Sequence, residues 1–288
     1  MTRSQQWAVF AGGTITAGFE FRTQSVHNVG IRQRHLSLTQ QSTPLNLVDS
    51  QQLLILMYHH VAPAPANTRL RGLYTTPRQF DGHLRWLKTQ PVEFTTFARL
   101  SAGQTSDFRT KIVITFDDGL HDNYTAALPI LQKYDVPAVI YPIMGELGRR
   151  AVTWPEAKDQ TPADIISERE IREMADRGIE FGSHLMDHTH LTRHDHEEQM
   201  RQLTESKNAL EQILSADALS VAYPYGDVDE AAVARAKQAG YQFGLTTIEG
   251  SNTRDSDPMQ LKRLPAKGTR LYHPLKFRRL LRKHLENE

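Results

Sequence analysis

The sequence contains no cysteine, almost no net charge and no long apolar run. Without cysteine, disulfides, thiolate metal sites and cysteine nucleophiles are excluded. The 34 Lys and Arg residues balance the 33 Asp and Glu residues to a formal net charge of +1, so the chain has no overall attraction to nucleic acid. No segment is apolar enough for a transmembrane helix, and we expect no integral membrane segment. We expect instead an uncharged or weakly charged partner, while the oligomeric state stays open.

The N-terminal region is rich in Gln, Ser and Thr and shows no sustained periodicity, so residues 1–50 are predicted to be an extension, partly disordered. Its uncharged stretch at residues 5–19 is interrupted by Gly and Thr and leads to no clear cleavage site, which argues against a signal peptide and for a cytoplasmic chain. We expect the main domain at residues 51–270 and a basic C-terminal helix within residues 271–288, where an amphipathic pattern covers Lys276 to Lys283.

Short apolar runs of strand length recur through the main domain, at residues 53–57, 112–116, 138–141, 179–182, 219–222, 241–245 and 261–264. Helical patterns lie between them, at residues 78–87, 126–134, 168–177, 197–214 and 229–239. Alternation of strands and helices with short turns predicts a parallel α/β architecture, and seven strands favour a barrel-like closure.

Two adjacent carboxylates, Asp117 and Asp118, follow a buried strand in the segment Thr-Phe-Asp-Asp-Gly. Such a pair is costly unless its charge is compensated, and a cation would compensate it. Because adjacent side chains point differently, one carboxylate could bind the cation while the other stays free as a base. The alternative is a turn whose two side chains are solvated.

Two histidines at a spacing of four, His184 and His188, follow another strand end. Histidines at this spacing are often surface residues, but with Asp118 they form a set of three ligands that leaves positions open for water and substrate. That arrangement is typical of a catalytic metal site. The neighbouring Asp187 is expected to face solvent, and His190, His194 and His196 are expected to be exposed residues of the following loop and helix start.

Two further strand ends carry aromatic and imidazole groups. His59 or His60, after the first strand, could act as a general acid at the mouth of the barrel, and a packed structural histidine is the alternative. The segment Tyr223, Pro224, Tyr225 predicts a rigid loop suited to a sugar-binding wall, with a fixed backbone N–H that could stabilise an oxyanion. The alternative there is an ordinary turn with a packed tyrosine.

These four segments, in this order, resemble the polysaccharide deacetylases of the NodB-homology type, carbohydrate esterase family 4, over roughly residues 53–265. The resemblance implies a distorted (β/α)7 barrel that binds a divalent metal ion, with zinc expected and cobalt or nickel tolerated. It implies that Asp117 is the catalytic base and that Asp118, His184 and His188 bind the metal. It also implies action on envelope or extracellular glycans, in contrast to the cytoplasmic interpretation of the N-terminus.

The start Tyr58-His59-His60 is similar to the poly-N-acetylglucosamine deacetylase branch, in which an early histidine supplies the acid. The resemblance therefore makes His59 the acid and ranks His273 second. It also implies that the backbone N–H of Tyr225 holds the oxyanion, with Tyr223 and Pro224 beside the substrate.

The sequence departs from the family pattern at two positions near the site. Leu185 replaces the usual Ser or Thr that supports the ligand loop, and Ala222 replaces the Arg that orients the base. The Asp-rich fourth signature of the family has no clear match. Arg263, on the last predicted strand, is a candidate substitute for the missing Arg.

The predicted function is metal-dependent removal of N-acetyl groups from a polysaccharide or oligosaccharide of N-acetylhexosamine, with release of acetate. Two alternatives stay open: an O-acetyl esterase acting on a glycan such as acetylxylan, and a non-catalytic carbohydrate-binding protein on the same fold. Acetate release from N-acetylated against O-acetylated glycans distinguishes these three.

Overall fold

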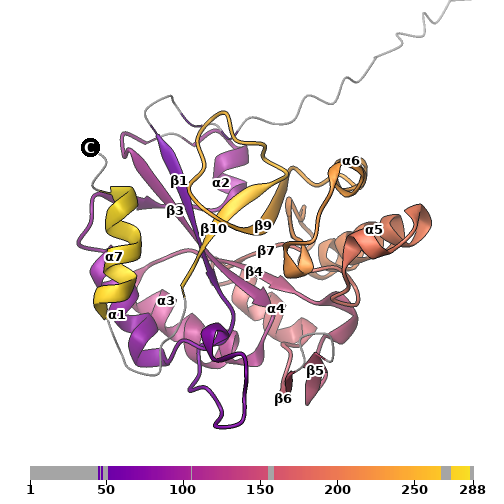
Figure 1. The fold of residues 1–288 in the computed structure, drawn as a ribbon, viewed down its shortest axis with the longest axis horizontal. Coiled ribbons are helices and arrows are strands. Elements are labelled where there is room, and N and C mark those ends of the chain that lie inside the picture. The colour runs from indigo at the N-terminus through magenta and orange to yellow at the C-terminus, as the bar shows by residue number, and fades with distance from the viewer. Residues whose placement is uncertain are drawn as a thin grey trace, which may run out of the picture. The chain divides into compact units, whose positions relative to one another are not determined.

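The structure is a computed structural model that describes residues 45, 47, 51–104, 106–154, 159–266 and 274–285 (Figure 1). Nearly all of the predicted extension at residues 1–50 lies outside the described residues, and so does His273. Among the described residues, no helix has both the length and the apolar character to cross a lipid bilayer.

One parallel sheet forms the centre of the molecule. Its strands lie in the order β7 (Glu180–Phe181), β4 (Val139–Pro142), β3 (Thr110–Asp118), β1 (Gln52–Tyr58), β10 (Leu261–Pro265), β9 (Phe243–Glu249) and β8 (Ser220–Ala222). Past β7, Ser183 pairs with Val221 of β8, so the first and last strands of this order meet. The sheet is thus a nearly closed barrel, which confirms the predicted fold.

The central strands form because their residues are apolar on both faces. Every residue of β3 is buried, and the β1 side chains Leu53, Leu54, Ile55 and Leu56 are fully buried. A continuous apolar run of this kind suits a parallel strand covered on both sides. Each of the seven predicted runs overlaps a strand in the structure.

Helices connect the strands and cover the barrel. They are α1 (Pro77–Leu87), α2 (Phe97–Ser101), α3 (Leu128–Tyr134), α4 (Glu168–Ala175), α5 (His196–Leu214), α6 (Glu230–Gln238) and α7 (Pro274–Leu285). A π-helical turn at Asn123–Ala127 precedes α3, and short 3-10 turns occupy Arg71–Leu73, Met144–Glu146, Leu191–Arg193 and Pro224–Gly226. Thr76 and Ser167 close capping boxes with Gln79 and Glu170, which fix the starts of α1 and α4.

One short helix, α2, and three strands have no counterpart in the sequence pattern. Strand β2 (Val92–Phe94) pairs with β3, and β5 (Val152–Trp154) with β6 (Asp159–Ala163) forms an antiparallel hairpin. Strands of three residues are too short to show a period, and β6 contains no apolar run. The hairpin matters for the site because its Thr161 reaches the cavity described below.

Candidate active site

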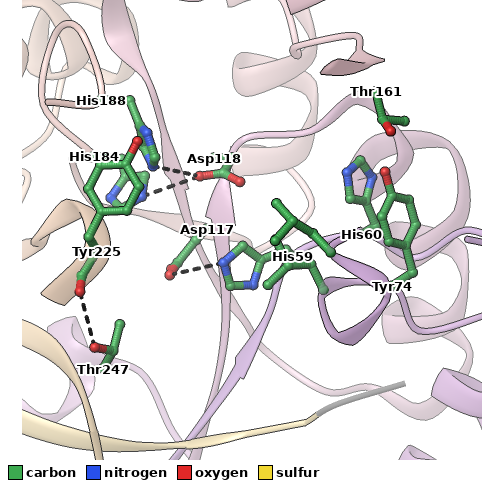
Figure 2. A pocket seen from close by; sticks show the side chains of 12 residues that line it. His59, His60, Tyr74, Asp117, Asp118, Thr161, His184, His188, Tyr225 and Thr247 are labelled. Carbon is green, nitrogen blue, oxygen red and sulfur yellow. Dashed lines mark hydrogen bonds and ion pairs between the residues drawn. The ribbon is translucent and has the colours of Figure 1, made fainter. Parts of the chain in front are cut away.

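The functional side chains come from the carboxyl ends of neighbouring strands. Asp117 and Asp118 end β3, His59 follows β1, His184 and His188 lie in the loop after β7, and Tyr225 follows β8. In a parallel barrel all these ends lie at one rim, so residues far apart in sequence are brought together. Side chains from all of these segments line one cavity of about 210 Å³ (Figure 2).

Asp118, His184 and His188 form a compact set of three. Asp118 Oδ1 lies 3.3 Å from Nε2 of His184 and 3.3 Å from Nε2 of His188. One ligand atom from each residue lies within 4.8 Å of the others. Burial by itself raises the pKa of Asp118, but the two adjacent histidines outweigh burial and hold that pKa well below its usual value.

This set fits a divalent cation. Asp118 Oδ1 is buried, and no hydrogen bond of acceptable geometry reaches it from the described residues. His184 Nδ1 lies 2.6 Å from the carbonyl oxygen of Ala222, so the proton stays on Nδ1 and the lone pair of Nε2 points into the site. One carboxylate oxygen and two imidazole nitrogens that converge in this way are the donors of catalytic zinc sites.

Asp117 is held by Arg263 through two parallel hydrogen bonds. Arg263 Nη1 and Nη2 donate to Oδ1 and Oδ2 of Asp117 at 2.7 and 2.8 Å, and both side chains are buried. Arg263 Nε donates to the carbonyl oxygen of Thr246 at 2.8 Å, which fixes the guanidinium plane. Burial raises the pKa of Asp117, but Arg263 and then His184 outweigh it, so the net pKa is lowered. Arg263 therefore holds Asp117 in a fixed orientation.

His59 lies beside Asp117 in the cavity (Figure 2). Its Nε2 is 3.9 Å from Asp117 Oδ2. Burial lowers the pKa of His59, and the charges of Asp118 and Asp117 offset only part of that effect. The adjacent His60 is bound differently, since its Nδ1 lies 2.6 Å from Asp122 Oδ2 and its ring stacks on Tyr74 at 4.0 Å.

Tyr225 forms the opposite wall of the cavity in a strained turn. Its φ of 60° is left-handed, and Thr247 Oγ1 donates to its carbonyl oxygen at 3.2 Å. The ring packs against His188 at 4.8 Å and stacks on His190 at 4.1 Å. His190 is therefore largely packed rather than exposed, contrary to the expectation from sequence.

The predicted substrate contact of Tyr223 and Pro224 is corrected by their burial. Tyr223 is fully buried among apolar side chains, Pro224 is also buried, and neither lines the cavity. Of the three, only Tyr225 lines the cavity. The reason is the left-handed backbone at Tyr225, which a pattern of residue types does not reveal.

Several cavity-lining residues carry no signal in the sequence. They are Leu70, Leu73, Tyr74, Thr161 and Thr247. The first three lie in the irregular segment after β1, and the other two lie on strands β6 and β9. Residues of these types occur throughout the chain, and only the three-dimensional arrangement selects them.

Comparison with known proteins agrees with this geometry. Residues 105–244 match the family model of polysaccharide deacetylases. The Bacillus subtilis protein YxkH, provisionally named a polysaccharide deacetylase, is 29% identical over 216 residues, which are 74% of this chain and 71% of YxkH. The poly-beta-1,6-N-acetyl-D-glucosamine N-deacetylase of Staphylococcus aureus is 25% identical over 252 residues, which are 80% of this chain and 84% of that protein.

A solved polysaccharide deacetylase from Bacillus cereus superposes with a TM-score of 0.68 at 26% identity and covers 80% of this chain and 69% of its own. In sequence and in fold the chain is similar to polysaccharide deacetylases, and these similarities support an enzyme of that class.

Proposed function

We propose that the protein is a metal-dependent hydrolase that removes N-acetyl groups from a polysaccharide or oligosaccharide of N-acetylhexosamine and releases acetate. One observation carries the proposal: an Arg-held carboxylate, Asp117, adjoins the convergent donors of Asp118, His184 and His188 in one cavity. A carboxylate that lies beside a cation site without being one of its ligands is the arrangement that generates a nucleophile from water.

Asp118, His184 and His188 hold the metal ion in this proposal, with zinc expected and cobalt or nickel tolerated by the same donors. When bound, such an ion supplies a water molecule of lowered pKa and polarises the carbonyl of the acetyl group. Asp117 accepts the proton of the attacking water. Arg263 keeps Asp117 ionised and oriented for that transfer, because both carboxylate oxygens are fixed.

His59 is proposed as the general acid. An amide nitrogen leaves only after protonation, and Nε2 of His59 lies on the cavity wall near the base. His60 is less suited because Asp122 and Tyr74 hold its ring. An acid close to the base favours an amide substrate over an ester, since an alkoxide leaves more readily than an amide anion.

Tyr225 is proposed to stabilise the oxyanion with its backbone N–H. The left-handed turn sets the direction of this N–H, and the bond from Thr247 to the Tyr225 carbonyl oxygen holds the peptide that follows. Preorganised donors are worth most in a site that excludes water. The ring of Tyr225 forms a wall against which a sugar ring can pack.

The test is acetate release by purified, metal-loaded protein from chitooligosaccharides, poly-N-acetylglucosamine and acetylated xylan. We expect turnover of the N-acetylated glycans, loss of turnover with a chelator, and recovery with added zinc. Faster release from acetylated xylan would favour the O-acetyl esterase, and no release from any acetylated glycan would favour a carbohydrate-binding protein.

A further inference from the structure

The loop from His184 to His188 carries two of the three proposed metal ligands in a strained conformation. Leu185 has a φ of 65° and His188 a φ of 50°, in the left-handed region that bulky side chains avoid. Such a conformation persists only where the surroundings determine it. The distance between the two imidazoles therefore depends on the contacts that hold the loop.

The first half of the loop is held by the 3-10 turn that follows β4 and by Ser183. Met144 N donates to the carbonyl oxygen of Leu185 at 2.9 Å, and Gly145 N donates to that of Met186 at 2.8 Å. Ser183 Oγ accepts from Leu185 N at 3.0 Å. These bonds secure the chain close to His184 but do not reach the N–H groups that lead to His188.

Gln202 of α5 holds the second half. Its Oε1 accepts from Met186 N at 3.0 Å and from Asp187 N at 3.2 Å. Its Nε2 donates to Asp187 Oδ2 at 2.6 Å and to Glu198 Oε1 at 2.8 Å. The side chain is 1% exposed, so both hydrogens and the oxygen of this buried amide are used, and its orientation is determined.

We infer that Gln202 is a positioning residue of the metal site, which fixes His188 relative to His184. Leu185 stands where the family pattern has Ser or Thr, and a leucine side chain cannot form hydrogen bonds to the loop. Gln202 provides such hydrogen bonds from α5. The inference rests on the metal site of the proposed function but not on its substrate.

The experiment compares metal binding by the full chain and by the variant Gln202→Met, which keeps the volume and removes all four hydrogen bonds. Zn²⁺ affinity is measured by competition with a chromophoric chelator, and the absorption spectrum of the Co²⁺ form reports ligand geometry. Loss of a group that orients metal ligands typically weakens binding about 10- to 100-fold. We expect a loss in that range and a changed Co²⁺ spectrum.

The matched control is Gln199→Met. Gln199 is 4% exposed on the same helix, but it bonds to the carbonyl oxygen of His194 and to Arg235, not to the ligand loop. We expect its Zn²⁺ affinity to stay within about twofold of wild type. If Gln202→Met did the same, the inference would be wrong.

A second variant covers the case in which Gln202→Met does not fold. Gln202→Glu keeps an acceptor for Met186 N and Asp187 N but places a carboxylate against Asp187 and Glu198, so we again expect weaker Zn²⁺ binding and an altered Co²⁺ spectrum. Failure of both variants to fold, or wild-type binding by either, overturns the inference. If wild-type protein bound no Zn²⁺, the proposed function would fail first, which separates the two outcomes.

Discussion

At the residue scale, the site combines a motif that is contiguous in sequence with a partner that is distant. Asp117 and Asp118 are adjacent, so their polarity after an apolar run could be predicted from the sequence. Arg263 lies 146 residues away from Asp117, and one arginine among many gives no sign of its burial. Arg263 was a candidate from the sequence only because Ala222 stands where an Arg side chain is expected. Distant partners of this kind require the fold to be known.

Replacing Arg263 with Lys tests whether orientation of Asp117 matters beyond charge. Lysine keeps the positive charge but cannot make two parallel bonds. Small misplacement of a catalytic group costs about 100-fold, so we expect kcat to fall by about that factor while the fold is retained, measured by acetate release and circular dichroism. Lys262→Arg, at an exposed position of the same strand, is the control. A wild-type kcat in Arg263→Lys would show that the two parallel bonds from Arg263 are not needed to orient Asp117.

At the element scale, α7 closes over α1 through an aromatic contact that includes a buried histidine. His83 of α1 stacks on Phe277 of α7 at 3.7 Å, and Tyr58 Oη lies 3.2 Å from His83 Nδ1. The amphipathic pattern predicted the helix α7, but its contact surface on α1 became visible only in the structure. Burial lowers the pKa of His83 from 6.5 to about 3.

This histidine should make stability depend on pH. Below pH 6.5 the unfolded chain binds a proton at His83 while the folded chain does not until about pH 3, so stability falls as pH falls through this window. The loss is at most about 1.4 kcal/mol per pH unit. We expect His83→Phe, which keeps the stacking, to unfold with a shallower pH dependence between pH 6.5 and 4 in denaturant titrations. An unchanged slope would show that His83 is protonated without cost.

At the scale of the whole molecule, barrel closure brings the strand ends together. The seven apolar runs and the order of the polar strand ends were sufficient to predict the fold, since strand period and connection length are local properties. The irregular segment after β1 and the β5–β6 hairpin were not predictable, because nothing local in their residues specifies where they lie. The turn at Tyr225 was predicted, but the sequence did not reveal which of its side chains faces the cavity. Yet Tyr74, Thr161 and Tyr225 define the cavity walls.

Metal binding should stabilise the whole barrel. An ion that binds only the folded chain adds about 2.7 kcal/mol at a concentration one hundred times its Kd. We expect zinc to raise the Tm of the wild-type protein in a thermal melt and to leave that of His184→Ala unchanged. An equal rise in both proteins would indicate binding elsewhere on the surface.

The proposed mechanism depends most on two adjacent carboxylates having different roles, Asp117 as the base and Asp118 as a metal ligand. The measurement that tests it most directly is zinc content together with acetate release from N-acetylglucosamine oligomers, for Asp117→Asn and Asp118→Asn side by side. We predict that Asp117→Asn keeps its zinc and loses turnover by at least about 100-fold, as expected for removal of a general base. We predict that Asp118→Asn loses zinc and turnover together. Near wild-type turnover in Asp117→Asn, or full zinc content in Asp118→Asn, would contradict the account.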